Sequence, residues 1–144
     1  MDSRFSSAVH MLILVSESEK PMTSEEIAVS VGTNASYIRK LSGLLKKHGI
    51  IESRQGARGF SLLISPEDLT LLCIYQAVSE SDRVHIFDLH QNPNDACIVG
   101  RHIRPVMTEV FREAEEKAEQ ELKRQTLKTC MDRMLEDIRR SEDR

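Results

Sequence analysis

Residues 23–62 read TSEEIAVSVGTNASYIRKLSGLLKKHGIIESRQGARGFSL, and this stretch carries the patterns that predict the fold. It opens with a capping box, in which Thr23 accepts a backbone hydrogen bond and Glu26 reaches back to the residue before the helix. Gly32 is suited to end that helix, and Asn34 is suited to cap the next one. Two helices joined by so short a turn are typical of a helix-turn-helix.

A β-hairpin is predicted directly after the second helix. Two short β-prone runs, residues 50–54 and 60–63, flank the Gly-rich turn QGARG at residues 55–59. Strand-forming residues on both sides of such a turn favour an antiparallel pair. A helix-turn-helix followed by a hairpin is the order of a winged helix.

Amphipathic helices are expected on both sides of this unit. Apolar residues recur at helical spacing over residues 4–17 and 126–138, and a longer helix is expected from Ile98. A further helix is expected to start at Ser65, its N-cap, with Pro66 at the first position, and to continue as far as Glu80.

The long helix from Ile98 allows two interpretations. Past Phe111 its apolar stripe narrows to Ala114, Ala118 and Leu122, with Glu and Lys around them. Such a stripe suits a dimer seam. An ordinary helix packed on its own domain fits the spacing equally well. Residues 81–97, which precede this helix, are less regular and either pair as a short strand or simply pack.

The expected fold is therefore mainly α, with a winged helix-turn-helix domain plus a long C-terminal dimerisation helix. Residues 1–64 are expected to form the DNA-binding domain, and residues 65–97 a connecting helix and a sensor loop. Residues 98–144 would form the dimerisation helix and a C-terminal docking helix.

Composition excludes several classes of protein. The chain has 144 residues, 40% of them hydrophobic and only 4% aromatic, with no Trp, which argues against an all-β sandwich. The longest apolar run, residues 11–15, is far too short to span a bilayer. The three cysteines are odd in number and far apart, which favours the reducing cytoplasm over a disulfide scaffold.

Charge is distributed unevenly along the chain. Residues 34–63 carry six basic side chains against one acidic side chain, whereas residues 64–144 carry 12 basic and 17 acidic ones. A basic patch on an otherwise acidic protein can steer it toward a polyanion. The patch falls on the two elements of a winged helix that would touch DNA, so double-stranded DNA is the expected partner.

Candidate DNA contacts come from the start of the first helix, the second helix and the wing. Hydroxyls and helix N-termini would bind phosphate, basic residues would bind guanine or phosphate, and the wing would enter a minor groove. The candidates are Thr23, Ser24, Asn34, Ser36, Tyr37, Arg39, Lys40, Lys46, Lys47, Arg54, Gln55 and Arg58.

Two other functions compete with DNA binding. A winged helix can bind a protein partner and never touch DNA, in which case the charges only solvate the surface. An enzyme is not expected, because the chain has no Gly-rich phosphate loop, no His-Glu pair at zinc spacing and no Ser or Cys nucleophile motif.

Three segments resemble the Rrf2 family (BadM/Rrf type) of bacterial winged helix-turn-helix transcriptional regulators. They are ASYIRKL at residues 35–41, LLKKHGIIESR at residues 44–54, and GFSL at residues 59–62 with Pro66 and Leu69-Thr70-Leu71 after it. The resemblance implies a homodimer on a palindromic operator, with paired long helices as the interface and a sensor loop near the wing. Residues 34–47 would be the recognition helix and residues 53–60 the wing.

This chain departs from the family pattern in the wing and in its cysteines. Where the family has an Arg-Gly pair and then Gly-Gly-Tyr, the wing here has Gln55-Gly56 and Arg58-Gly59-Phe60. Family members that sense iron, nitric oxide or redox state hold an iron–sulfur cluster on three closely spaced cysteines before the long helix. Residues 81–104 contain one cysteine with scattered histidines, so neither a cluster nor another cofactor or metal is expected.

Cys97 has two interpretations. It precedes a predicted helix N-terminus, where the helix dipole can lower the thiol pKa and make the residue a redox sensor. Alternatively it is a buried, inert residue at the dimer core. Cys73 and Cys130 lie on apolar stripes and are expected to be core residues.

The expected function is that of a cytoplasmic, homodimeric, sequence-specific transcriptional regulator. A repressor is favoured over an activator, because steric occlusion of a promoter requires no activation surface. Its signal would be redox state, through Cys97, or a small ligand between the domains.

Overall fold

The two helices of the helix-turn-helix begin and end at the predicted caps. The computed structural model describes residues 2–53 and 59–143. Helix α2 (Ser24–Val31) has the complete capping box of Thr23 and Glu26, and it ends at Gly32, whose φ of 83° is left-handed. Helix α3 (Ala35–Lys47) is capped by Asn34, whose side-chain oxygen accepts from the Tyr37 N–H at 2.9 Å.

The predicted hairpin is also confirmed. Strand β1 (Ile51–Ser53) pairs antiparallel with β2 (Phe60–Leu62), and Ile51 lies opposite Leu62. At the base of the wing, Gly59 has a φ of 152°, and a Cβ there would lie 2.4 Å from the Pro21 Cβ. Any other side chain here would strain the backbone and clash with Pro21. Glycine therefore lets the wing pack against the segment that leads into α2.

One core joins the winged helix to the C-terminal part of the chain. Helix α1 (Arg4–Glu17) contacts α2, β2, α4 (Leu71–Ser79) and α6 (Leu127–Glu142). The side chains with essentially no solvent exposure are Met11, Leu12, Ile27, Ile38, Leu41, Leu45, Ile50, Ile51, Leu69, Ile74, Val78 and Leu127. Leu127, the first residue of α6, thus anchors the end of the chain in the same core as α1 and α4.

The prediction that a helix starts at Ser65 is wrong. Residues 66–68 form a turn, and α4 begins only at Leu71, capped by the Thr70 side chain. The Leu71 N–H donates to the carbonyl of Gln125 at 3.0 Å, and the Leu127 N–H donates to the carbonyl of Leu69 at 2.8 Å. These bonds fix residues 69–71 in an extended bridge to the chain around Thr126, so a continuous helix from Ser65 cannot form.

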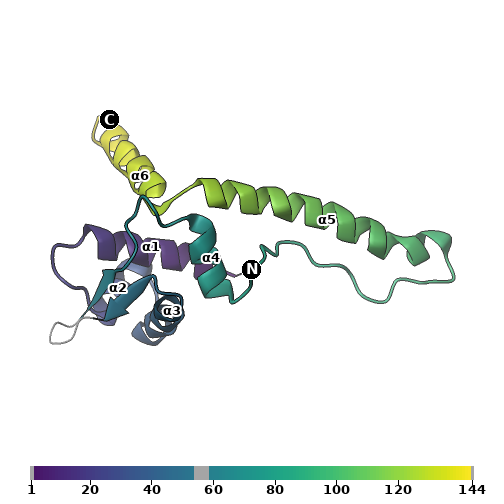
Figure 1. Ribbon diagram of the computed structural model, residues 1–144, viewed down its shortest axis with the longest axis horizontal. Helices are drawn as coiled ribbons and strands as arrows, with labels where there is room; N and C mark the ends of the chain where they lie inside the picture. The colour runs from purple at the N-terminus through teal and green to yellow at the C-terminus, as the bar shows by residue number, and fades with distance from the viewer. Residues whose placement is uncertain (1, 54–58, 144) are drawn as a thin grey trace.

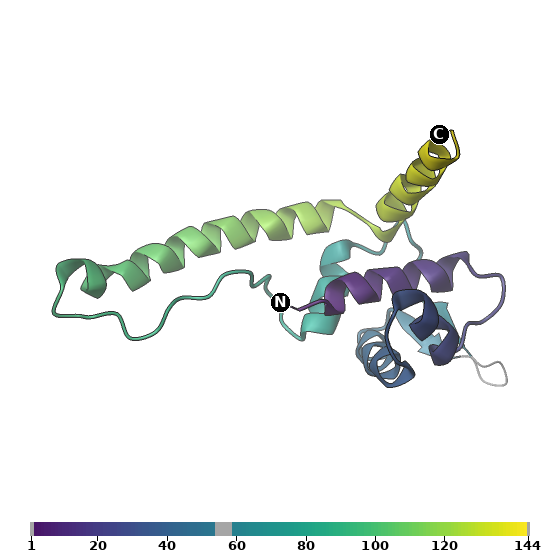
Figure 2. The same cartoon turned by 180° about the vertical axis from the view of Figure 1, so that it is seen from behind.

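Helix α5 (Ile98–Arg124) projects away from the winged helix, and residues 81–97 run beside it (Figures 1 and 2). None of its 27 residues is buried. The end of the helix packs on its own domain, and the dimer seam stays a prediction. Leu122, near its end, packs against the core, whereas Val106 is 54% exposed. The last helix, α6, runs to Glu142 and so extends beyond the expected range of 126–138.

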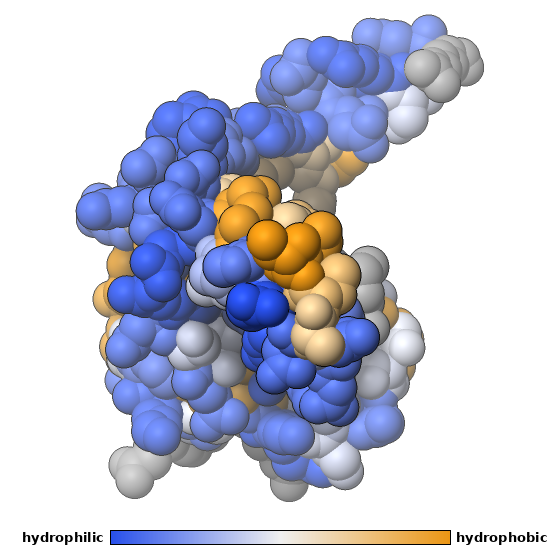
Figure 3. Space-filling model, turned by 90° about the vertical axis from the view of Figure 1, so that its right-hand side faces the viewer, coloured by the Kyte–Doolittle hydropathy of each residue, from blue (hydrophilic) through white to orange (hydrophobic). Residues whose placement is uncertain are grey.

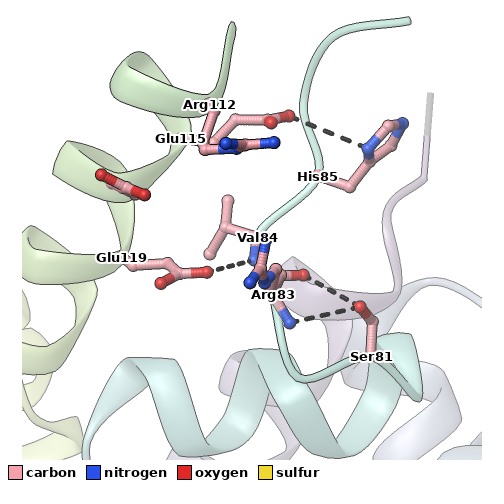
Figure 4. Close-up of a pocket in the computed structure, with 8 residues that line it drawn as sticks. Ser81, Arg83, Val84, His85, Arg112, Glu115 and Glu119 are labelled. Carbon is pink, nitrogen blue, oxygen red and sulfur yellow. Dashed lines mark hydrogen bonds and ion pairs between the residues drawn. The ribbon is translucent and has the colours of Figure 1, made fainter. Parts of the chain in front are cut away.

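Residues 81–97 pack on α5 without forming a strand. Glu119 accepts from the Val84 N–H at 2.8 Å (Figure 4). Glu115 accepts from the N–H groups of Ile86 at 2.6 Å and Phe87 at 3.2 Å. The Phe87 ring stacks on Phe111 with 5.0 Å between centroids. Side-chain carboxylates of α5 therefore accept from backbone donors that a neighbouring strand accepts from in a sheet.

Candidate nucleic-acid interface

Helix α3 separates an apolar face from a polar one. Ile38, Leu41 and Leu45 are fully buried against the other helices. The residues predicted to contact DNA lie mainly on the opposite face. Of these, Ser36, Arg39, Lys40, Lys46 and Lys47 are exposed, whereas Tyr37 is half-buried and packs against the core.

Arg39 is held by an ion pair that sequence reasoning missed. Its Nη2 lies 2.8 Å from Oε1 of Glu25, in the first turn of α2, and both side chains are more than half exposed. The N–H of Glu25 itself and then the Arg39 guanidinium hold the pKa of the Glu25 carboxyl below its usual value, so this side chain is ionised at neutral pH. The pair spans the two helices of the helix-turn-helix.

Lys46 connects α3 to the wing. Its Nζ lies 5.3 Å from the centroid of the Phe60 ring on β2, within the range of a cation–π contact. Lys47, the next residue, is exposed in the last turn of α3, where a positive charge also interacts favourably with the helix dipole. One of the basic residues predicted to contact phosphate therefore links α3 to β2.

Two of the other predicted contacts also have structural roles. The Thr23 hydroxyl accepts from the Glu26 N–H and donates to its carboxylate, and the Asn34 side chain is engaged by the Tyr37 N–H. Ser24, at the start of α2, is half-buried and makes no such contact within the described part of the chain. Arg54, Gln55 and Arg58 lie outside the described residues.

The cysteines divide into one exposed thiol and two half-buried thiols. Cys97 is exposed at the N-cap of α5, where the N–H groups of Gly100 and Val99 hold its thiol pKa below the usual value. Exposure in the single chain fits the redox-sensor interpretation, and burial of Cys97 at a dimer core stays a prediction. Burial raises the pKa of Cys73 and Cys130, which pack against the core as expected.

Cys97 is therefore expected to react with limiting iodoacetamide at least ~10-fold faster than Cys73 or Cys130, because the exposed thiol with the lowered pKa has the larger thiolate fraction. Peptide mass spectrometry at a series of times would give the three rates. In urea the rates should converge, since unfolding removes the differences in burial. Equal rates in the folded protein would contradict this assignment.

Comparison with known proteins shows that the chain is similar to transcriptional regulators. The model of the Rrf2 family, described as iron-dependent transcriptional regulators, matches residues 1–133. YwnA of Bacillus subtilis (strain 168), which bears the name of an HTH-type transcriptional regulator, is 40% identical over 134 residues, or 93% of this chain and 98% of YwnA.

Solved structures agree with this match. A crystal structure described as that of a DNA-binding protein is 39% identical, has a TM-score of 0.73 and aligns over 90% of this chain and 99% of its own. IscR from T. potens, at 22% identity, shares the fold with a TM-score of 0.68 over 96% of this chain and 87% of IscR.

The description of that family implies iron, but the ligands of this chain do not fit a cluster. Iron–sulfur clusters are held by Cys thiolates, and Cys97 is the only cysteine in residues 81–104. Cys73 and Cys130 lie half-buried in α4 and α6. Across residues 2–53 and 59–143, no three His, Cys, Asp or Glu side chains are grouped so that they could hold a metal ion. Within the same ranges no helix is long and apolar enough to cross a membrane.

Proposed function

Because this chain belongs to the Rrf2 family of transcriptional regulators, we propose that it is a homodimeric repressor that binds a palindromic operator in DNA. The observation that carries the proposal is the exposed basic face of α3, opposite the buried face that fixes the helix in the core. In a helix-turn-helix the second helix enters the major groove, where its N-terminal residues meet base edges. Arg39 and Lys40 would read guanine, and Lys46 and Lys47 would bind phosphate.

The homodimer is supported by the exposed apolar side of α5. At about 3.6 residues per turn, Val99, Val106 and Val110 fall on one side of the helix, opposite to Glu115 and Glu119, which hold residues 84–87. These three valines are 66%, 54% and 48% exposed. Figure 3 looks at the end of the molecule where α5 begins and shows an apolar patch surrounded by hydrophilic surface.

A second copy of α5 is the occupant that best fits this patch. Two identical apolar stripes complement each other across a two-fold axis, as an isologous interface requires. The same axis would relate two recognition helices, and for that reason the operator would be palindromic.

The three parts of the chain would then have separate roles. Residues 1–64 would bind DNA, residues 65–97 would form the connecting helix and sensor loop, and residues 98–144 would dimerise and dock back on the core. The exposed Cys97 thiol, or a small ligand between the domains, would receive the signal. Bound to an operator, such a dimer would block transcription sterically, and it would act in the cytoplasm, where a bacterial chromosome lies.

Selection of bound fragments from random DNA by the purified, reduced protein tests this proposal. Enrichment of a two-fold symmetric site supports a dimeric DNA-binding regulator. If no sequence is enriched even at low salt, the proposal fails, and a protein partner becomes the better explanation of the winged helix.

Substitutions on α3 should separate base contacts from phosphate contacts. Arg39→Ala is expected to lower affinity for the selected site by roughly 10- to 100-fold and to relax base preference. Lys47→Ala should weaken binding to all DNA alike and reduce the slope of log affinity against log salt by about one. Titrations of the selected and a scrambled duplex at several salt concentrations would measure both. Equal losses on the two duplexes for both variants would contradict the assignment.

A further inference from the structure

Glu25 is an acidic side chain on the face where a polyanion is expected to bind. It lies in the first turn of α2, whose N-terminus would face a phosphate, and its side chain is 65% exposed. An ionised carboxylate there repels phosphates and so lowers affinity for any DNA. The presence of this charge on a DNA-binding face therefore needs a reason.

A contribution of Glu25 to the stability of the fold does not explain the charge. The partner of Glu25 is Arg39, and the Glu25 Oε1 to Arg39 Nη2 distance is 2.8 Å. The Arg39 side chain is 57% exposed. Ion pairs as exposed as this one contribute little to folding. Glu26, the adjacent residue, is the one that forms the capping box with Thr23, so α2 does not depend on Glu25 for its cap.

The pair does have a consequence for recognition. A guanidinium carries five N–H donors, and the contact with Glu25 goes through Nη2. Donors therefore remain for a bidentate contact with the O6 and N7 atoms of guanine. A long Arg side chain loses rotamer freedom when it binds, and a carboxylate that already restricts it reduces that loss.

We propose that Glu25 is a positioning and specificity-determining residue, which orients the Arg39 guanidinium toward the bases and repels DNA that offers Arg39 no guanine. At the operator, the Arg39–guanine contact offsets the repulsion between Glu25 and the backbone. On other sequences the repulsion remains without compensation. This inference rests on the proposed function, because it requires that α3 read DNA.

Glu25→Gln tests the proposal, since it removes the charge and keeps the size and hydrogen-bonding capacity of the side chain. The ratio of affinities for the selected operator and a scrambled duplex is expected to fall roughly three- to tenfold. Most of the change should come from tighter binding to the scrambled duplex. Glu52→Gln is the matched control, because Glu52 is exposed on β1 and its carboxylate makes no ion pair with Arg39 in the described residues. It should leave the ratio unchanged.

A double-mutant cycle with Arg39→Ala distinguishes positioning from a general effect of charge. In the Arg39→Ala background, Glu25→Gln should strengthen binding to both duplexes equally. The ratio of operator affinity to scrambled-duplex affinity should then be the same with Glu25 as with Gln. The proposal is overturned if Glu25→Gln leaves the ratio unchanged in the wild-type background, or changes it equally with and without Arg39. A wild-type protein that selects no sequence would instead refute the proposed function, and the role of Glu25 with it.

Discussion

Val106→Glu combined with Val110→Glu is expected to convert the protein to monomers and to lower its affinity for the selected operator at least ~100-fold. Both valines lie on the side of α5 that residues 84–87 leave uncovered. In a two-fold interface each substitution occurs in both copies, so four carboxylates would meet where apolar side chains should pack. A buried charge without a partner is costly, and association is lost.

Sedimentation or light scattering over a range of protein concentrations would measure the oligomeric state, and titration of the operator would measure the affinity. Thr108→Glu is the control, since Thr108 is exposed on the opposite side of α5. It should remain a dimer with near wild-type affinity. A Val106→Glu, Val110→Glu variant that stays dimeric would show that the two copies meet through another surface.

The parts of the fold that sequence predicted well are set by neighbouring residues. A capping box, a left-handed glycine and an Asn cap are local features, and Thr23, Gly32 and Asn34 all have the predicted roles. The start of α4 depends instead on backbone bonds between residues 69–71 and 125–127, which are distant in the sequence. The motif at Ser65-Pro66 contains no sign of that pairing.

In the candidate site, too, local features are predictable from the sequence and contacts between separate helices are not. The exposure of Arg39 and Lys40 follows from the helical spacing of the buried leucines, and the structure agrees. The contact between Arg39 and Glu25 depends on how α2 and α3 are placed relative to each other, which spacing along one helix does not reveal. The sequence signal that could have found it was the second acidic residue, Glu25 beside the capping Glu26, at the start of a helix that precedes a basic one.

The bridge between α4 and α6 makes Leu127 the residue through which the C-terminal region is fixed to the core. Its side chain is fully buried in the core that also contains residues of α1 and α4, and its N–H donates to the Leu69 carbonyl. Leu127→Ala would leave a cavity in that core. The free energy of unfolding is therefore expected to fall by about 2–5 kcal/mol.

Unfolding in urea at a fixed protomer concentration would measure this loss, since the stability of the proposed dimer would depend on concentration. Leu63→Ala makes the same chemical change at a side chain that is 53% exposed, and it should cost at most about 0.5 kcal/mol. If the two variants lose the same stability, Leu127 does not anchor the C-terminal helices. If Leu127→Ala alone is destabilised, the winged helix and the C-terminal helices share one core.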